Sequence, residues 1–138
     1  MSHLAPVLYS RKLLLLGVGL IALTIVSGAA SPALAQSYPK TFKLNYAWSY
    51  RDVSQVPNID QWPQATLKLN RNGSVDGYSE YTGNLTPNIG TWVQRSGRIT
   101  FTFPSATYTG QRQQDGSYNG TMTNTNGWYG AWKGRFYP

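Results

Sequence analysis

The chain has 138 residues, with 12 Lys and Arg against 5 Asp and Glu, a single His and no Cys. The only histidine is His3, so the rest of the chain offers neither imidazole nor thiol. This excludes Ser/His/Asp and Cys/His nucleophilic catalysis, zinc sites built on imidazole or thiolate, and disulfide bonds. No glycine-rich phosphate loop followed by Lys-Ser or Lys-Thr is present either.

Residues 1–35 have the three parts of a secretory signal peptide. Arg11 and Lys12 form a short positive segment, residues 13–26 are uncharged and apolar, and 31–35 ends in a small-x-small pattern. A single membrane anchor is the alternative, since the apolar run reaches about the lower limit of a bilayer span. The Ser-Pro step and the Ala-x-Ala site favour cleavage after Ala35, and no cysteine follows the apolar run to carry a lipid. We therefore expect a secreted or periplasmic protein with no membrane anchor after cleavage.

Residues 36–138 are expected to form one mature domain, long enough to bury a core. They carry 10 Lys and Arg against 5 Asp and Glu, a net charge of +5. This excess favours acidic partners such as envelope polymers or anionic surfaces. The basic residues are nevertheless scattered, as on an ordinary soluble surface. Nucleic acid is not an expected partner, because export would separate the protein from it.

Apolar and polar residues alternate with a period of two through most of 36–138, which predicts strands and no helix. Asn72-Gly73 and Asp115-Gly116 predict two-residue hairpins, because both positions must accept positive φ. Further turns are expected at 87–88, 96–97, 104–105 and 126–127, and a long loop at 51–63. The predicted strands are 42–50, 65–70, 75–85, 90–93, 99–103, 106–113, 118–123 and 128–136.

The segment 75–85 has the most regular alternation. Every charged residue in it falls on one face, so the opposite face, with Val75, Tyr81, Gly83 and Leu85, is expected to point to the core.

Eight strands joined in sequence leave two open edges unless the sheet closes on itself. Eight is also the number at which such a sheet closes around a lumen that side chains fill or that holds one small ligand. Inward glycines suit the bends of a narrow barrel. We predict an all-β fold, a single small antiparallel up-and-down barrel of about eight strands, with a two-sheet sandwich as the alternative.

Two Gly-x-Trp steps, Gly90-Thr91-Trp92 and Gly130-Ala131-Trp132, lie in these Tyr-, Thr- and Gly-rich strands. With the secretion signal and the sequential strands, they make residues 40–138 resemble the small lipocalin-like or avidin-like (calycin-type) secreted barrels. The resemblance implies a ligand-binding barrel. In lipocalins the motif marks the first strand, where this chain has Tyr46-Ala47-Trp48. No biotin-contacting or retinoid-contacting residue is therefore carried over to a position here.

Carboxylates are the remaining groups that could do acid/base chemistry after residue 35. Asp52 and Asp60 share the long loop and could form a pair of the kind used in glycoside hydrolysis. Loop aspartates more often hydrogen-bond their own backbone. We therefore expect a protein that is not an enzyme and has no catalytic residues, no metal and no cofactor.

Aromatic residues are in surplus, at 18 of the 103 positions from 36 to 138, and packing explains those on core faces. Others lie in the long loop, on outward faces, or at the start of the last strand. Rings beside polar residues suit a sugar-binding or protein-binding surface, although each could instead cover the end of the barrel. The candidate ligand-binding residues are Arg51, Asp52, Trp62, Tyr78, Trp128 and Tyr129.

These observations predict a non-enzymatic binding module that takes a small apolar or glycan ligand at one barrel mouth. Loop 51–63 and turn 124–129 would form the lips. The alternative is a protein-interaction factor, such as an exported protease inhibitor or envelope assembly component, acting through loop 51–63 on an envelope or extracellular protein. A hydrolase using Asp52 and Asp60 is a third hypothesis.

Overall fold

The computed structural model describes residues 36–79 and 82–138. The predicted signal peptide, residues 1–35, and two residues of the predicted third strand, Glu80 and Tyr81, lie outside the described residues. Residues 37–138 form one compact unit. Within the described ranges, no helix is long and apolar enough to cross a membrane.

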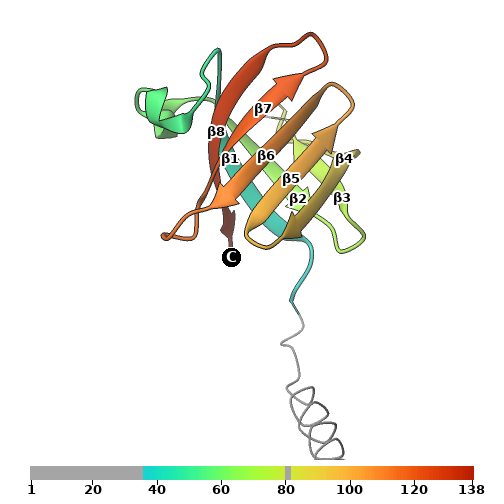
Figure 1. Cartoon of the computed structure of the whole chain (residues 1–138). Coiled ribbons are helices and arrows are strands. Elements are labelled where there is room, and N and C mark those ends of the chain that lie inside the picture. The colour runs from blue at the N-terminus through green and yellow to red at the C-terminus, as the bar shows by residue number, and fades with distance from the viewer. Residues whose placement is uncertain (1–35, 80–81) are drawn as a thin grey trace, which may run out of the picture. The chain divides into compact units, whose positions relative to one another are not determined.

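Eight antiparallel strands follow one another around a closed barrel, and the last pairs with the first (Figure 1). The strands are β1 Lys40–Trp48, β2 Gln64–Leu69, β3 Ser74–Tyr78, β4 Leu85–Arg95, β5 Arg98–Phe103, β6 Ala106–Arg112, β7 Tyr118–Asn124 and β8 Tyr129–Tyr137. Two short 3-10 helices, η1 Val53–Gln55 and η2 Ile59–Gln61, lie in the loop between β1 and β2. The predicted up-and-down barrel is confirmed, and the sandwich alternative is wrong.

The interior is filled by alternate side chains of the strands, as period-two patterning requires. Trp132 of β8 lies at its centre, fully buried, with its indole N–H donating to the Thr121 carbonyl oxygen at 3.0 Å. Gly120 on the neighbouring strand β7 and its partner Gly110 on β6 make room for this ring: a Cβ at Gly110 would lie 2.6 Å from two of its carbons. The Phe42 ring closes the packing against Trp132, with 6.1 Å between ring centroids. The inward glycines therefore serve ring packing as well as bends.

The prediction for residues 75–85 is wrong in its second half. β3 ends at Tyr78, the Ser79 N–H donates to the Asn84 carbonyl oxygen at 3.0 Å, and Gly83 has a φ of +67°. Leu85 begins β4 and is 42% exposed, so it does not belong to the core. A glycine in a turn can fall in line with the inward positions of the preceding strand. Alternation alone then cannot distinguish it from an inward strand glycine, which explains the error.

The turn predicted at Pro87-Asn88 is also wrong, because both residues lie inside β4. Asn88 takes a left-handed φ of 54°, and the pairing between β3 and β4 shifts register between Val75 and Gly77. The Asp76 carboxylate accepts the Asn88 N–H at 2.9 Å, which holds this bulge in place. A Pro-Asn pair can mark a bulge as well as a turn, since both need a local break in the ladder.

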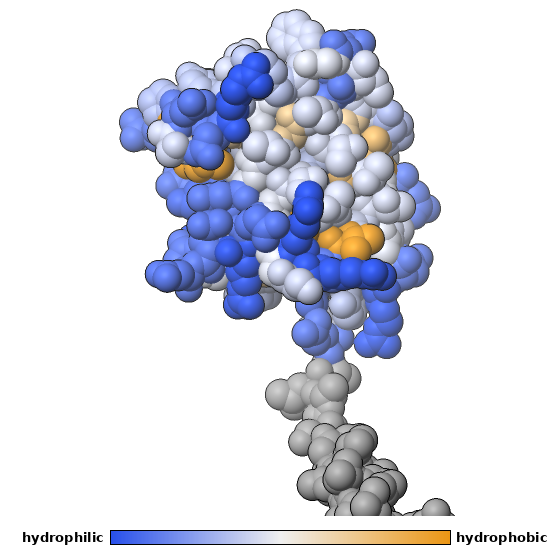
Figure 2. Space-filling model, viewed as in Figure 1, coloured by the Kyte–Doolittle hydropathy of each residue, from blue (hydrophilic) through white to orange (hydrophobic). Residues whose placement is uncertain are grey.

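The loop 51–63 folds back over the outer wall of the barrel. Ala47 of β1 and Ala131 of β8 face outward as direct cross-strand partners, yet both are buried because Val56 and Ile59 of the loop cover them. The Asn45 side-chain amide donates to the Trp62 carbonyl oxygen at 2.7 Å and fixes the end of the loop. Figure 1 shows this loop beside β8. The outer face seen in Figure 2 is otherwise mainly hydrophilic, with small separate apolar areas.

Candidate functional site

An apolar pocket of about 270 Å³ opens at one mouth of the barrel. This is the end at which β1 finishes, β2 begins, and a turn joins β5 to β6. Most of its lining comes from inward positions of β1, β2, β4, β5 and β6. The lining residues are Leu44, Tyr46, Ala65, Leu67, Ile89, Phe103, Ser105, Ala106 and Tyr108. We call this site the mouth pocket.

Large and small side chains alternate around the mouth pocket, and this leaves the space open. The small Ala65 and Ala106 lie beside the larger Leu44 of β1 and Phe103 of β5, which are their cross-strand partners. The Phe103 ring stands edge-on to the Tyr108 ring, with 5.5 Å between centroids, and it occupies the place that a Cβ at Gly90 would need. The aromatic wall therefore depends on glycine at position 90.

Two phenol groups and one hydroxyl are the polar groups of the mouth pocket. Burial, and to a lesser extent the neighbouring Tyr46, raise the pKa of Tyr108 to about 12. Tyr108 therefore stays a neutral phenol that can donate one hydrogen bond. Within the described part of the chain, the lining contains no ionisable acid or base other than these phenols. An ionic ligand would therefore find no counter-charge among these residues.

Two of the predicted site residues come together at the same end of the barrel. The Arg51 guanidinium carbon lies 4.2 Å from the centroid of the Tyr129 ring, which is cation–π distance. Trp128 precedes Tyr129 in the β7–β8 turn and is 61% exposed. The Asn124 side-chain oxygen accepts the Trp128 N–H at 2.9 Å, so this turn is held in shape.

The other three predicted residues have local structural roles. Asp52 caps η1 by accepting the Ser54 N–H at 2.7 Å, and hydrogen bonds from Ser54 lower the pKa of its carboxyl. Trp62 is half-buried, donates its indole N–H to the Pro57 carbonyl oxygen at 2.9 Å, and meets the Tyr50 ring edge-on. Tyr78 ends β3, and its ring lies 5.7 Å below the Lys68 ammonium.

All six predicted residues are described, and none of them lines the mouth pocket. Loop 51–63, expected as a lip, lies instead on the outer wall, and none of its residues lines the pocket. Asp52 and Asp60, the hypothetical catalytic pair, have separate structural roles. Asp52 caps η1, and the Asp60 carboxylate lies 3.8 Å from the Lys133 ammonium.

The sequence analysis did not single out Tyr46, Phe103 and Tyr108 as site residues, because packing explains aromatic residues on inward faces. A usable signal was present. Inward aromatic residues at strand ends next to small inward residues, Ala65 and Ala106, mark a place where the core cannot be filled.

In the described ranges, no group of three or more His, Cys, Asp or Glu could hold a metal ion. Comparison with protein-family models, with curated proteins and with solved structures finds no match for this chain.

Proposed function

We propose that the protein is a binding module that holds one small, uncharged, largely apolar molecule in the mouth pocket without converting it. The observation that carries this proposal is an open apolar pocket inside an otherwise filled barrel. The predicted signal peptide would place this activity in the periplasm or the medium.

The size and chemistry of the pocket support this ligand class. Its volume of about 270 Å³ is slightly below the usual range of ligand pockets, about 300–1,000 Å³, so only a small molecule fits. Burying an ion without a partner is costly, so the lining favours neutral molecules. The phenol of Tyr108 supplies a donor for one oxygen atom on the ligand. A sugar fits less well, because few polar atoms face this space to replace the water around its hydroxyl groups.

Ligand-detected NMR with three probes that share one ring tests the proposal: cyclohexanone, cyclohexanecarboxylate and cyclohexylammonium. We expect binding of the ketone and at least tenfold weaker binding of the two ions. Ala106→Leu fills the pocket and should abolish ketone binding. Thr107→Leu adds a similar side chain on the exposed outer face of the same strand and should not. Equal binding of all three probes, or ketone binding that persists in Ala106→Leu, would contradict the proposal.

A second candidate function, capture of a protein partner such as a protease, is supported by Trp128. A tryptophan that is 61% exposed on a fixed turn has the character of an interface anchor, because little entropy is lost when it docks. Loop 51–63 supports this function less, since it turns Val56 and Ile59 toward the barrel. Inhibition of a protease panel that is lost in Trp128→Ala would support capture, and no inhibition by the unchanged protein would count against it.

A further inference from the structure

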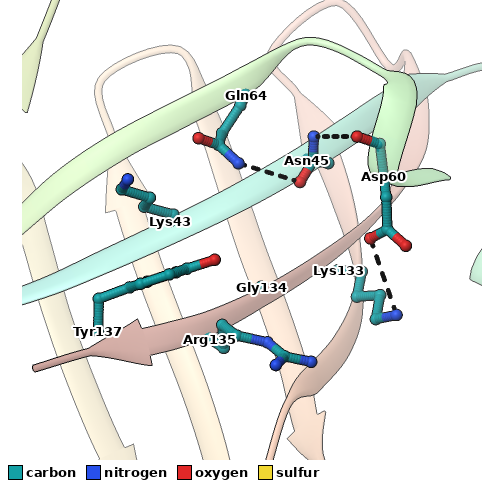
Figure 3. Close-up of a pocket in the computed structure, with 8 residues that line it drawn as sticks. All are labelled: Lys43, Asn45, Asp60, Gln64, Lys133, Gly134, Arg135 and Tyr137. Atoms are coloured by element: carbon teal, nitrogen blue, oxygen red, sulfur yellow. Dashed lines mark hydrogen bonds and ion pairs between the residues drawn. The ribbon is translucent and has the colours of Figure 1, made fainter.

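A second hollow lies on the outside of the barrel, across β1 and β8 (Figure 3). It has a volume of about 360 Å³, and we call it the outer groove. It is separate from the mouth pocket because successive residues of β1 point to opposite faces of the sheet: Leu44 lines the pocket, and Lys43 and Asn45 line the groove.

The outer groove has an excess of positive charge. Lys43, Lys133 and Arg135 line it, against the single carboxylate of Asp60. Lys43 and Arg135 are direct cross-strand partners, an arrangement of like charges that costs stability in a sheet. A bound anion would relieve this repulsion.

The acidic neighbours of these cations compensate them only weakly. Asp60 lies 3.8 Å from the Lys133 ammonium, and Asp115 lies 3.7 Å from the Arg135 guanidinium. The side chains of both aspartates are more than half exposed, and exposed pairs of this kind contribute little to stability because solvent screens them. Lys43 has no ion pair with an acidic residue of the described ranges.

Polar and aromatic side chains complete the outer groove. Tyr137 is 42% exposed, and its ring centroid lies 4.8 Å from the Lys43 ammonium. Gln64 of β2 and Asn45 of β1 also line the groove (Figure 3). The Asn45 side-chain amide donates to the Trp62 carbonyl oxygen at 2.7 Å, which fixes it. An exposed ring, fixed amides and cations form a set that can recognise a sugar ring, its hydroxyl groups and an attached acid group.

We infer that the outer groove binds an acidic sugar residue of a polysaccharide. The sugar carboxylate lies between Lys43 and Arg135, the sugar ring rests against Tyr137, and Gln64 meets its hydroxyl groups. Lys133 lies two residues from Arg135 on the same strand, about 7 Å along the wall, so the charges suit an extended chain better than a compact free anion.

The described surface favours a polysaccharide over a lipid membrane. A membrane-docking face combines cations with large apolar side chains that enter the lipid. The large exposed aliphatic residues, Leu85 and Val93, lie on β4, which is not a neighbour of β1 or β8 in the barrel. Trp128 lies in the β7–β8 turn and does not line the groove.

Isothermal titration of the purified protein with oligogalacturonate, and with its neutral methyl ester of the same length, tests this inference. We expect binding of the acid, weakened by added salt because exposed charges are screened. The ester should bind at least tenfold more weakly. Binding at the outer groove does not require the mouth pocket, so Ala106→Leu should leave it unchanged, and failure of either proposal leaves the other standing.

Matched variants separate a built site from general attraction. Lys43→Gln with Arg135→Gln should weaken acid binding at least tenfold. Arg95→Gln with Arg112→Gln removes the same charge from exposed positions outside the groove and should have little effect. Tyr137→Ala should weaken binding, and thermal melting checks that each variant is folded.

Four outcomes would overturn the inference: no binding of the acid, equal binding of acid and ester, equal losses in the two double variants, or no loss in Tyr137→Ala. Anionic phosphatidylglycerol vesicles form the last comparison. Tighter binding to vesicles than to the oligosaccharide, lost with Lys43 and Arg135, would assign the groove to lipid headgroups instead.

Discussion

Replacing Gly110 with Ala tests the packing on which the barrel depends. The new methyl carbon would lie 2.6 Å from two carbons of the Trp132 ring and 3.1 Å from the Asn119 carbonyl oxygen. Carbon atoms pack at about 3.5–4.0 Å, so the ring must move by about 1 Å. Trp132 is fully buried, and its indole N–H is held by the Thr121 carbonyl oxygen, so it has little freedom to do so.

Overpacking of this kind costs about 1–3 kcal/mol, and we expect the upper end for an enclosed ring. For a domain of this size, each kcal/mol of lost unfolding free energy lowers the melting temperature by about 4–8 °C. The melting temperature of Gly110→Ala should therefore be lower by at least about 10 °C. Circular dichroism and tryptophan fluorescence measure the transition. The exposed neighbour provides the control, since Gln111→Ala should stay within about 0.5 kcal/mol.

A double-mutant cycle identifies the contact responsible. If the methyl group acts on the ring, Gly110→Ala should cost less in a Trp132→Phe background, with a coupling of at least about 0.5 kcal/mol. A Gly110→Ala variant that melts with the unchanged protein, or a cycle without coupling, would refute the proposed packing.

Three further predictions concern the loop, the pH dependence and the mouth pocket. Ala131→Glu should displace loop 51–63, because a carboxylate cannot replace a fully buried methyl group there; limited proteolysis should then cut the loop, and should not do so in Thr121→Glu, an exposed cross-strand neighbour. Hydrogen bonds from Ser117 lower the pKa of the Asp115 carboxyl, so its stabilisation is present above the unfolded pKa, near 4, and is lost as pH falls through the lowered folded value. Asp115→Asn should therefore narrow the difference in melting temperature between neutral and strongly acidic buffer, and an unchanged difference would contradict this role. Spectrophotometric titration should find a tyrosine that ionises only near pH 12, and this step should disappear in Tyr108→Phe; a late step that persists would assign it to another residue.

The alternation of side chains was sufficient to predict the barrel, because the strands change face at every residue and most turns carry Gly or Asn. The alternation gave wrong predictions where a position that fits the pattern of a strand lies in a turn. Gly83 was predicted as an inward strand position, but it is a turn residue with a left-handed φ. Leu85, predicted to point to the core with it, is exposed. Alternation also does not report cover from a loop: Ala47 and Ala131 are on the outward face, yet the long loop buries them.

The candidate site was harder to predict because no local pattern reports where a core is left incomplete. Trp62 stood out as an aromatic residue in a loop, yet Tyr50 and the Pro57 carbonyl oxygen hold it within that loop. Nothing in the sequence distinguished Tyr108 from other strand aromatics, and only the three-dimensional arrangement places Ala106 and Ala65 close enough to leave space beside it.

The packing of Trp132 against two glycines connects the stability of the barrel with the proposed function. Gly110 and Gly120 admit the Trp132 ring to the barrel centre, and that ring with Phe42 and Phe101 fills the interior below the mouth. A barrel of eight strands has room for either a packed core or one small ligand. Here Trp132 and the other buried side chains fill the centre, and the open mouth pocket lies at the end that carries Tyr46 and Tyr108. The glycines that allow tight packing therefore also limit the size of any ligand that the mouth pocket can hold.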